Sequence, residues 1–167
     1  MRLFCISGVS GSGKTTVVER LVPALVSRGF TVGTIKDIHA DDFALDTPGT
    51  NTDRHRRSGA HQVAAWGKDE TDILIPRRLS LDELLAFYIQ DIVIVEGGSG
   101  LALPRIVTAT TEEQAQARID SHTFAISGRI AARIETLDGL PAVDVLQHAD
   151  RLADLVLMVV PERSRCA

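Results

Sequence analysis

The sequence predicts an α/β fold with a doubly wound, mainly parallel sheet flanked by helices. Short apolar runs at 3–6 and 92–95 end in glycine or in an acid, which is typical of strands covered on both faces. Between residues 15 and 28 the apolar side chains return at helical spacing. The chain therefore opens as strand, glycine loop, helix and strand, which is how a doubly wound domain begins.

The remaining elements follow from the same patterns. Gly29 is expected to end the first helix, and Ser80 with Glu83 forms a capping-box pattern before another helix. The predicted strands are 3–6, 31–36, 62–66, 73–76, 91–96, 105–108 and 124–127. The predicted helices are 15–28, 53–59, the stretch after Ser80, 112–119 and 148–159, the last of which is apolar enough to be read as a strand. Residues 37–51 show no period and are expected to form a long loop, whose length suggests a function.

Composition limits the classes of protein that the chain can belong to. A length of 167 residues suits one domain, and 44% apolar and 24% charged residues are ordinary for a globular protein. The formal charge of −4 argues against nucleic-acid and membrane partners. The two cysteines, Cys5 and Cys166, suggest neither a disulfide framework nor a zinc cluster, so we expect a cytoplasmic protein.

A phosphate-binding motif follows the first predicted strand. Residues 8–15 match G-x-x-x-x-G-K-[ST], the P-loop pattern, and they lead directly into the first predicted helix. The loop amides and the helix N-terminus attract phosphate, Lys14 reaches the outer phosphates, and the Thr15 hydroxyl suits Mg²⁺. The expected nucleotide-binding residues are Gly8, Ser10, Gly11, Ser12, Gly13, Lys14, Thr15 and Thr16. The sequence thus predicts a single P-loop nucleotide-binding domain over residues 1–167, of the P-loop NTPase type.

Acidic residues at strand ends are the candidates for a metal site. Glu96 ends the most apolar strand, and open α/β sheets bind ligands at the carboxyl ends of their strands. Glu96 is expected to hold Mg²⁺ with Thr15 or to orient the attacking water, which makes Lys14 and Glu96 the candidate catalytic residues. Asp37 and Asp42, which follow the second strand, are further candidate metal ligands.

Basic side chains near the same loop could bind the nucleotide. Lys36 ends the second strand and could offset phosphate charge. Arg54 and Arg57 could bind an anion through their guanidinium groups, and an exposed helix face explains them equally well. An Asn-Lys-x-Asp signature is absent, so the residues alone leave guanine and adenine open, although the backbone of 125–129 could contact a base.

Three stretches together resemble the MobB family, molybdopterin-guanine dinucleotide biosynthesis protein B. They are "SGVSGSGKTT", "RGFTVGTIKDIHADDFALDTPGTNTDRHRRSGA" and "DIVIVEGG", and the resemblance is close over about the first hundred residues. It implies a homodimer that binds GTP with Mg²⁺, has weak GTPase activity and assists the attachment of GMP to molybdopterin beside a guanylyltransferase. By position, the resemblance places residues 8–16 at the nucleotide phosphates and Glu96 in the Mg²⁺ region.

Two other functions are compatible with the same motif. An ATP-dependent small-molecule kinase or ligase would use Lys36 and the acidic loop at the site of its acceptor. A nucleotide-gated scaffold or metallochaperone would bind nucleotide tightly without useful turnover. Stabilisation by GTP or by ATP in the presence of Mg²⁺ separates these alternatives.

Overall fold

The structure is a computed structural model that describes residues 1–39, 43–44 and 46–164. Two compact units make up the chain, one of residues 1–37 and 88–167 and the other of residues 38–87. The sequence predicts a single domain. The division into two compact units does not test that expectation, which stays a prediction.

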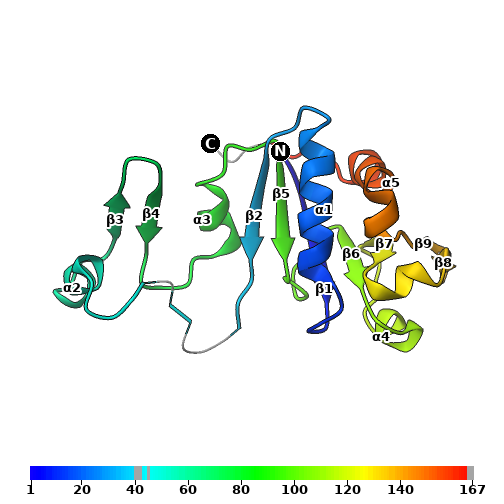
Figure 1. Ribbon diagram of the computed structural model, residues 1–167, viewed down its shortest axis with the longest axis horizontal. Helices are drawn as coiled ribbons and strands as arrows, with labels where there is room; N and C mark the ends of the chain where they lie inside the picture. Colours follow the sequence, from blue (N-terminus) through cyan, green and yellow to red (C-terminus); the bar gives the residue numbers. More distant parts are fainter. Residues whose placement is uncertain (40–42, 45, 165–167) are drawn as a thin grey trace. The chain divides into compact units, whose positions relative to one another are not determined.

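The first unit is built on a five-stranded sheet, and all its pairings are parallel (Figure 1). Its strands, in spatial order, are β2 (Val32–Lys36), β5 (Ile92–Glu96), β1 (Arg2–Gly8), β6 (Arg105–Thr108) and β7 (Thr123–Ser127). β1 and β5 are apolar and almost wholly buried, as a sheet covered on both faces requires. The predicted α/β class with a parallel sheet is confirmed.

Helices cover both faces of this sheet. On one face, α1 (Lys14–Val26) and α5 (Val145–Val159) share a core with Phe4, Ile6 and Ile94. On the other face, Val107 and Ile126 pack with residues of three smaller elements. These elements are α4 (Glu112–Gln116), the 3₁₀ helix η1 (Arg129–Ala132) and the hairpin of β8 (Thr136–Leu137) and β9 (Leu140–Pro141). Val17, Leu21 and Leu25 form the buried stripe of α1.

Several elements have bounds that differ from the predicted ones, and the element predicted at 148–159 is a helix and not a strand. α5 is a helix that begins at Val145, because the Asp144 side chain accepts the Leu146 N–H and caps it. The helix predicted at 112–119 ends at Gln116, and the first helix ends at Val26 rather than at residue 28. The strand predicted at 73–76 lies at Thr71–Leu74, in register with the strand before it.

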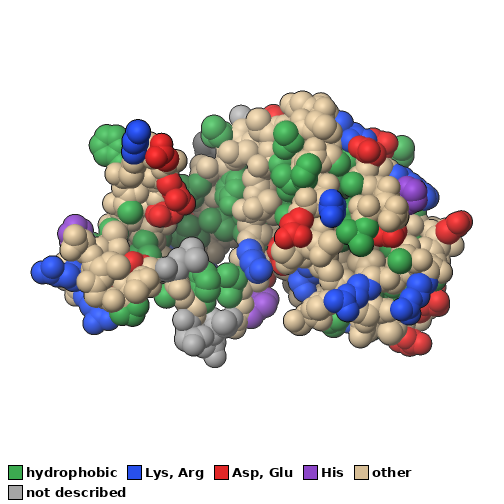
Figure 2. Space-filling view, in the orientation of Figure 1, with side chains coloured by type: hydrophobic (Ala, Val, Ile, Leu, Met, Phe, Trp, Pro, Cys, Tyr) green, Lys and Arg blue, Asp and Glu red, His purple; other side chains and the backbone are tan. Residues whose placement is uncertain are grey.

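The second unit contains α2 (Asn51–Arg57), an antiparallel hairpin and α3 (Leu81–Leu85). The hairpin strands are β3 (Val63–Trp66) and β4 (Thr71–Leu74). Ser80 and Glu83 form the predicted capping box of α3. Among the described residues of this unit only Asp53 and Val63 are buried, and hydrophobic side chains lie at its surface in Figure 2. Such a unit has little core of its own, and an isolated two-stranded sheet is marginally stable.

Candidate functional site

The glycine loop between β1 and α1 has the backbone conformation that its sequence predicts. Gly11 and Gly13 have φ of +73° and +104°, values that side-chain-bearing residues rarely adopt. Gly13 is the N-cap of α1 and makes no side-chain capping bond, so the first-turn N–H groups of the helix remain available. A helix N-terminus with free N–H groups behind a glycine loop is suited to binding phosphate.

Lys14 lies over the start of this loop. Its Nζ donates to Gly8 O at 2.9 Å and to Val9 O at 2.8 Å. Because an ammonium group carries three hydrogens, one N–H remains for a phosphate oxygen. The position therefore suits the role predicted for Lys14.

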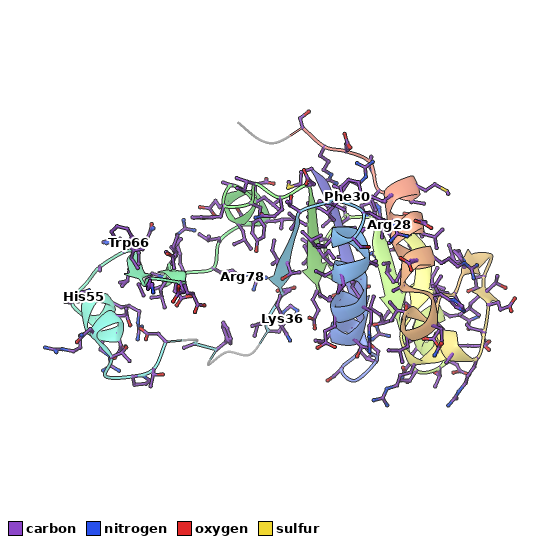
Figure 3. All side chains as sticks on the ribbon, turned by 45° about the horizontal axis from the view of Figure 1, so that its top comes forward. Arg28, Phe30, Lys36, His55, Trp66 and Arg78 are labelled. Carbon is purple, nitrogen blue, oxygen red and sulfur yellow. The ribbon has the colours of Figure 1, made fainter. Side chains whose placement is uncertain are left out.

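Thr15, in the first turn of α1, meets Glu96, the last residue of β5. Thr15 Oγ1 donates to Glu96 Oε1 at 2.7 Å, although 81 residues separate them. Lys36 Nζ lies 3.6 Å from the same oxygen, because the β2–β5 register pairs Lys36 with Glu96. Figure 3 shows Lys36 at the end of β2. The Glu96 side chain is 12% exposed and that of Lys36 is 61% exposed. The fold thus assembles the predicted Thr15, Glu96 and Lys36 around one carboxylate oxygen.

This donor set fits a magnesium ion that is shared with a nucleotide. Hydroxyl and carboxylate oxygens are the ligands that Mg²⁺ prefers, and Mg²⁺ commonly binds through one or two protein oxygens plus phosphates and waters. Among the described residues, no group of three His, Cys, Asp or Glu side chains could hold a metal by itself. A metal at Thr15 and Glu96 would therefore need phosphate oxygens to complete its shell.

Asp37 is fixed at the edge of the same site. Its Oδ2 accepts the Gly98 N–H at 3.2 Å, and its own N–H donates to Glu96 O at 2.9 Å. Gly97 has a φ of +105°, and a Cβ there would lie 2.9 Å from Asp37 Cβ. Asp37 thus shapes the turn that follows Glu96, and its predicted metal role stays a prediction. Asp42, the other predicted ligand, lies outside the described residues.

The remaining predicted binding residues differ in their surroundings. Ser10 is exposed, Thr16 is half-buried, and Ser12 is fully buried with its hydroxyl turned beneath the loop. Arg54 and Arg57 belong to the second unit, where Arg57 Nε lies 2.9 Å from Asp53 Oδ2. Arg54 is exposed, and nucleotide contact by either arginine stays a prediction.

Sequence reasoning missed two residues that lie beneath the loop. Thr108 ends β6, and its Oγ1 lies 2.7 Å from Ser12 Oγ. Gly128 follows β7, and a Cβ there would lie 2.3 Å from Ser12 O. Both come directly at the ends of parallel strands, so the rule that found Glu96 could have found them as well.

A parallel sheet with this glycine loop after its central strand, and an acid at the end of the adjacent strand, has the P-loop NTPase fold. Residues 3–131 match the family model MobB, molybdopterin guanine dinucleotide synthesis protein B. The chain belongs to the MobB family, as the resemblance in its first hundred residues predicted. No helix in the described part of the chain is long and apolar enough to cross a membrane.

Relatives and solved structures agree with this assignment. A Haemophilus influenzae protein named molybdopterin-guanine dinucleotide biosynthesis adapter protein is 31% identical over 80% of this chain and 78% of its own. An Escherichia coli protein of the same name is 27% identical over 93% and 91%. The crystal structure of Bacillus subtilis MobB matches with a TM-score of 0.76 and 25% identity, over 98% of this chain and all of that one. These matches extend beyond the first hundred residues.

Proposed function

We propose that this chain is a GTP-binding adapter protein with weak GTPase activity that assists the guanylylation of the molybdenum cofactor. The relatives named as adapters of molybdopterin-guanine dinucleotide biosynthesis support a role in that process. The observation that carries the nucleotide part is the meeting of Thr15 and Glu96 at 2.7 Å beside Lys14 and the N-terminus of α1. Triphosphate binding needs this combination of loop, lysine and metal-binding oxygens.

In this proposal some residues bind the phosphates and others bind the metal. The loop amides and Lys14 hold the phosphates, and Lys36 offsets their charge beside Glu96. Thr15 and Glu96 would hold Mg²⁺, which would supply positive charge against the phosphates. Guanine as the base rests on the family, since the described residues contain no Asn-Lys-x-Asp signature.

Slow hydrolysis agrees with the surroundings of the described carboxylates at this site. Glu96 accepts from Thr15 and lies next to Lys36, and Asp37 accepts from the Gly98 N–H. Carboxylates with such partners are suited to holding a metal and shaping a loop. They are less suited to taking a proton from water, which a fast hydrolase requires. The chain is therefore expected to act mainly through nucleotide binding.

The first test compares GTP with ATP. With Mg²⁺, GTP at 100 times its Kd should stabilise the protein by about 2.7 kcal/mol, and ATP by less. Lys14→Ala should abolish this gain, while Lys68→Ala, which alters an exposed lysine of the other unit, should retain it. Calorimetric melting and isothermal titration measure both effects. Stabilisation by ATP alone would favour the kinase or ligase alternative, and binding that survives Lys14→Ala would contradict the phosphate-loop site.

The second test concerns partners. A molybdenum cofactor guanylyltransferase, with molybdopterin as its substrate, is the proposed partner, and the proposed assembly of this chain is a homodimer. We expect the chain to co-purify with that enzyme and to raise its rate when GTP is present. An unchanged transferase rate together with tight GTP binding would favour a nucleotide-gated scaffold for another partner.

A further inference from the structure

Two buried hydroxyl groups form a chain beneath the phosphate loop. Thr108 and Ser12 are both fully buried, and Thr108 Oγ1 lies 2.7 Å from Ser12 Oγ. The Ser12 hydroxyl donates to Val9 O at 2.7 Å. Each hydroxyl has only one hydrogen. With the Ser12 hydrogen on Val9 O, the Thr108 hydroxyl donates to Ser12 Oγ across 2.7 Å in preference to Ser7 O, which lies 3.2 Å away. The hydrogen bonds therefore run in one direction, from the sheet to the loop.

Thr108 lies in close contact with Gly8, the first residue of the loop. The parallel register of β1 and β6 pairs Gly8 with Thr108. A Cβ on Gly8 would lie 2.3 Å from both Thr108 O and Thr108 Oγ1, and 2.7 Å from Ser12 Oγ. Thr108 Oγ1 also lies 3.2 Å from Ser7 O. Thr108 thus fills the space directly beneath the first turn of the loop.

The Val9 carbonyl connects the hydrogen-bonded hydroxyl groups of Thr108 and Ser12 to Lys14. Val9 O accepts both from Ser12 Oγ, at 2.7 Å, and from Lys14 Nζ, at 2.8 Å. With Ser12 held from below by Thr108, this carbonyl stays on the inner side of the loop. The Ser12 N–H donates to the same carbonyl at 3.3 Å, and the N–H groups that follow it, from Gly13 to Thr16, can face the opposite side, where a phosphate would lie.

We propose that Thr108 is a positioning residue that sets nucleotide affinity by holding the phosphate loop through Ser12. It acts from a strand outside the motif and does not touch the ligand. The inference rests on the proposed nucleotide binding and adds a residue to it. Since the loop grips phosphates and not the base, the effect of Thr108 should be the same for GTP and GDP.

The test removes the Thr108 hydroxyl and keeps the shape of the side chain. Thr108→Val should raise the Kd for GTP and for GDP by about 3- to 10-fold, the loss of one net hydrogen bond. Thr108→Ser keeps the hydroxyl and should restore the wild-type Kd. Isothermal titration with Mg²⁺ measures the Kd of each variant, and urea unfolding measures its stability.

Thr123 provides a matched control. It is a buried threonine at the start of β7, and its Oγ1 accepts from Asp120 N at 3.0 Å and lies 3.1 Å from Asp120 Oδ1. Thr123→Val also deletes a buried strand hydroxyl, but at the opposite end of its strand from the loop. It should lower stability and leave the nucleotide Kd unchanged. A purely structural effect of Thr108 would instead make the two valine variants alike.

The outcomes separate this inference from the proposed function. If the wild-type chain binds nucleotide and Thr108→Val binds it equally well, the inference is wrong and the proposed function stands. If the wild-type chain binds no nucleotide, both are wrong. Should Thr108→Val fail to fold, Ser12→Ala replaces it: a Kd rise shared by GTP and GDP supports the hydroxyl chain, and an unchanged Kd contradicts it.

Discussion

Gly128 and Gly139 both have a positive φ but differ in their surroundings. Their φ values are +79° and +78°. A Cβ on Gly128 would lie 2.3 Å from Ser12 O, whereas nothing lies within 4 Å of a Cβ on Gly139. Gly128 also has a ψ of −159°, in a region that is essentially confined to glycine, so Gly139 is a control for a positive φ alone.

Gly128→Ala should destabilise the protein more than Gly139→Ala. Both substitutions cost about 1–3 kcal/mol from the strain of a positive φ. Gly128→Ala should cost about 1–3 kcal/mol more, because the methyl group displaces the backbone under the phosphate loop. Urea unfolding of both variants measures the difference. Equal losses would show that the loop is not packed on Gly128.

Glu96 can be tested by removing its charge alone. Glu96→Gln keeps the shape of the side chain and an oxygen near Thr15. We expect nucleotide binding without metal to persist, while the gain in affinity from Mg²⁺ and the slow hydrolysis both fall by about tenfold or more. Nucleotide titrations with and without Mg²⁺, and a phosphate-release assay, measure these effects. Glu135→Gln, an exposed carboxylate outside the site, is the control. Unchanged hydrolysis in Glu96→Gln would remove its assigned role.

Local motifs made part of the site predictable. Gly8, Lys14 and Thr15 lie within eight residues of one another, so one short stretch of sequence predicts their arrangement. Glu96 followed from the rule for strand ends. Thr108 and Gly128 were not predicted, because the order of strands and their register bring them to the loop from about a hundred residues away. The rule for strand ends points to both residues, but no local pattern records that they lie beneath this loop.

At the scale of elements, burial decided which predictions were accurate. β1 and β5 are buried on both faces, and their continuous apolar runs located them well. β4 and α4 depend on a hairpin register and on a short cap, and their predicted bounds were displaced. A chain segment with few buried side chains gives a weak periodic signal.

Asp53 links α2 to the turn before it. Its carboxylate accepts the Gly49 N–H at 2.9 Å and lies 2.6 Å from Arg56 Nη2 and 2.9 Å from Arg57 Nε. The Gly49 N–H first, and then Arg56, lower the pKa of Asp53 from 3.8 to about 2. A lowered pKa stabilises the folded state above the unfolded pKa, and this contribution is lost as the pH falls through the folded pKa.

Residues 38–87 should therefore lose stability between pH 4 and pH 2, a window set by the lowered pKa of Asp53. Asp53→Asn should weaken this unit at pH 7 and reduce its loss on acidification. Trp66, the single tryptophan of the chain, reports on this unit by fluorescence anisotropy during urea unfolding at each pH. Asp72→Asn, which changes an exposed carboxylate of β4, is the control and should behave as the wild type. An acid response that is the same in all three proteins would contradict this role.

At the scale of the whole molecule, the sparse core of the second unit bears on assembly. Trp66 is 91% exposed and Ile73 is 50% exposed on a hairpin whose one buried hydrophobic residue, among those described, is Val63. Exposed apolar side chains on a two-stranded sheet are typical of a surface that another chain covers. This supports the homodimer that the family resemblance implies.

Sedimentation velocity should therefore give about twice the chain mass of 18.1 kDa. Trp66→Asp should shift the protein toward the monomer by placing a charge in the apolar surface of the hairpin. Met158→Asp, at a residue of α5 that is 80% exposed, is the matched control and should leave the dimer intact. A wild-type monomer at micromolar concentration would contradict the assembly, and equal effects of the two variants would contradict the role of the hairpin.

The measurement that tests the central claim most directly is a crystal structure with a non-hydrolysable GTP analogue and Mg²⁺. We expect the triphosphate to lie against the amides of residues 10–16, with Lys14 on its outer phosphates and the metal between Thr15 and Glu96. Electron density for the analogue elsewhere, with this loop unliganded, would contradict the account.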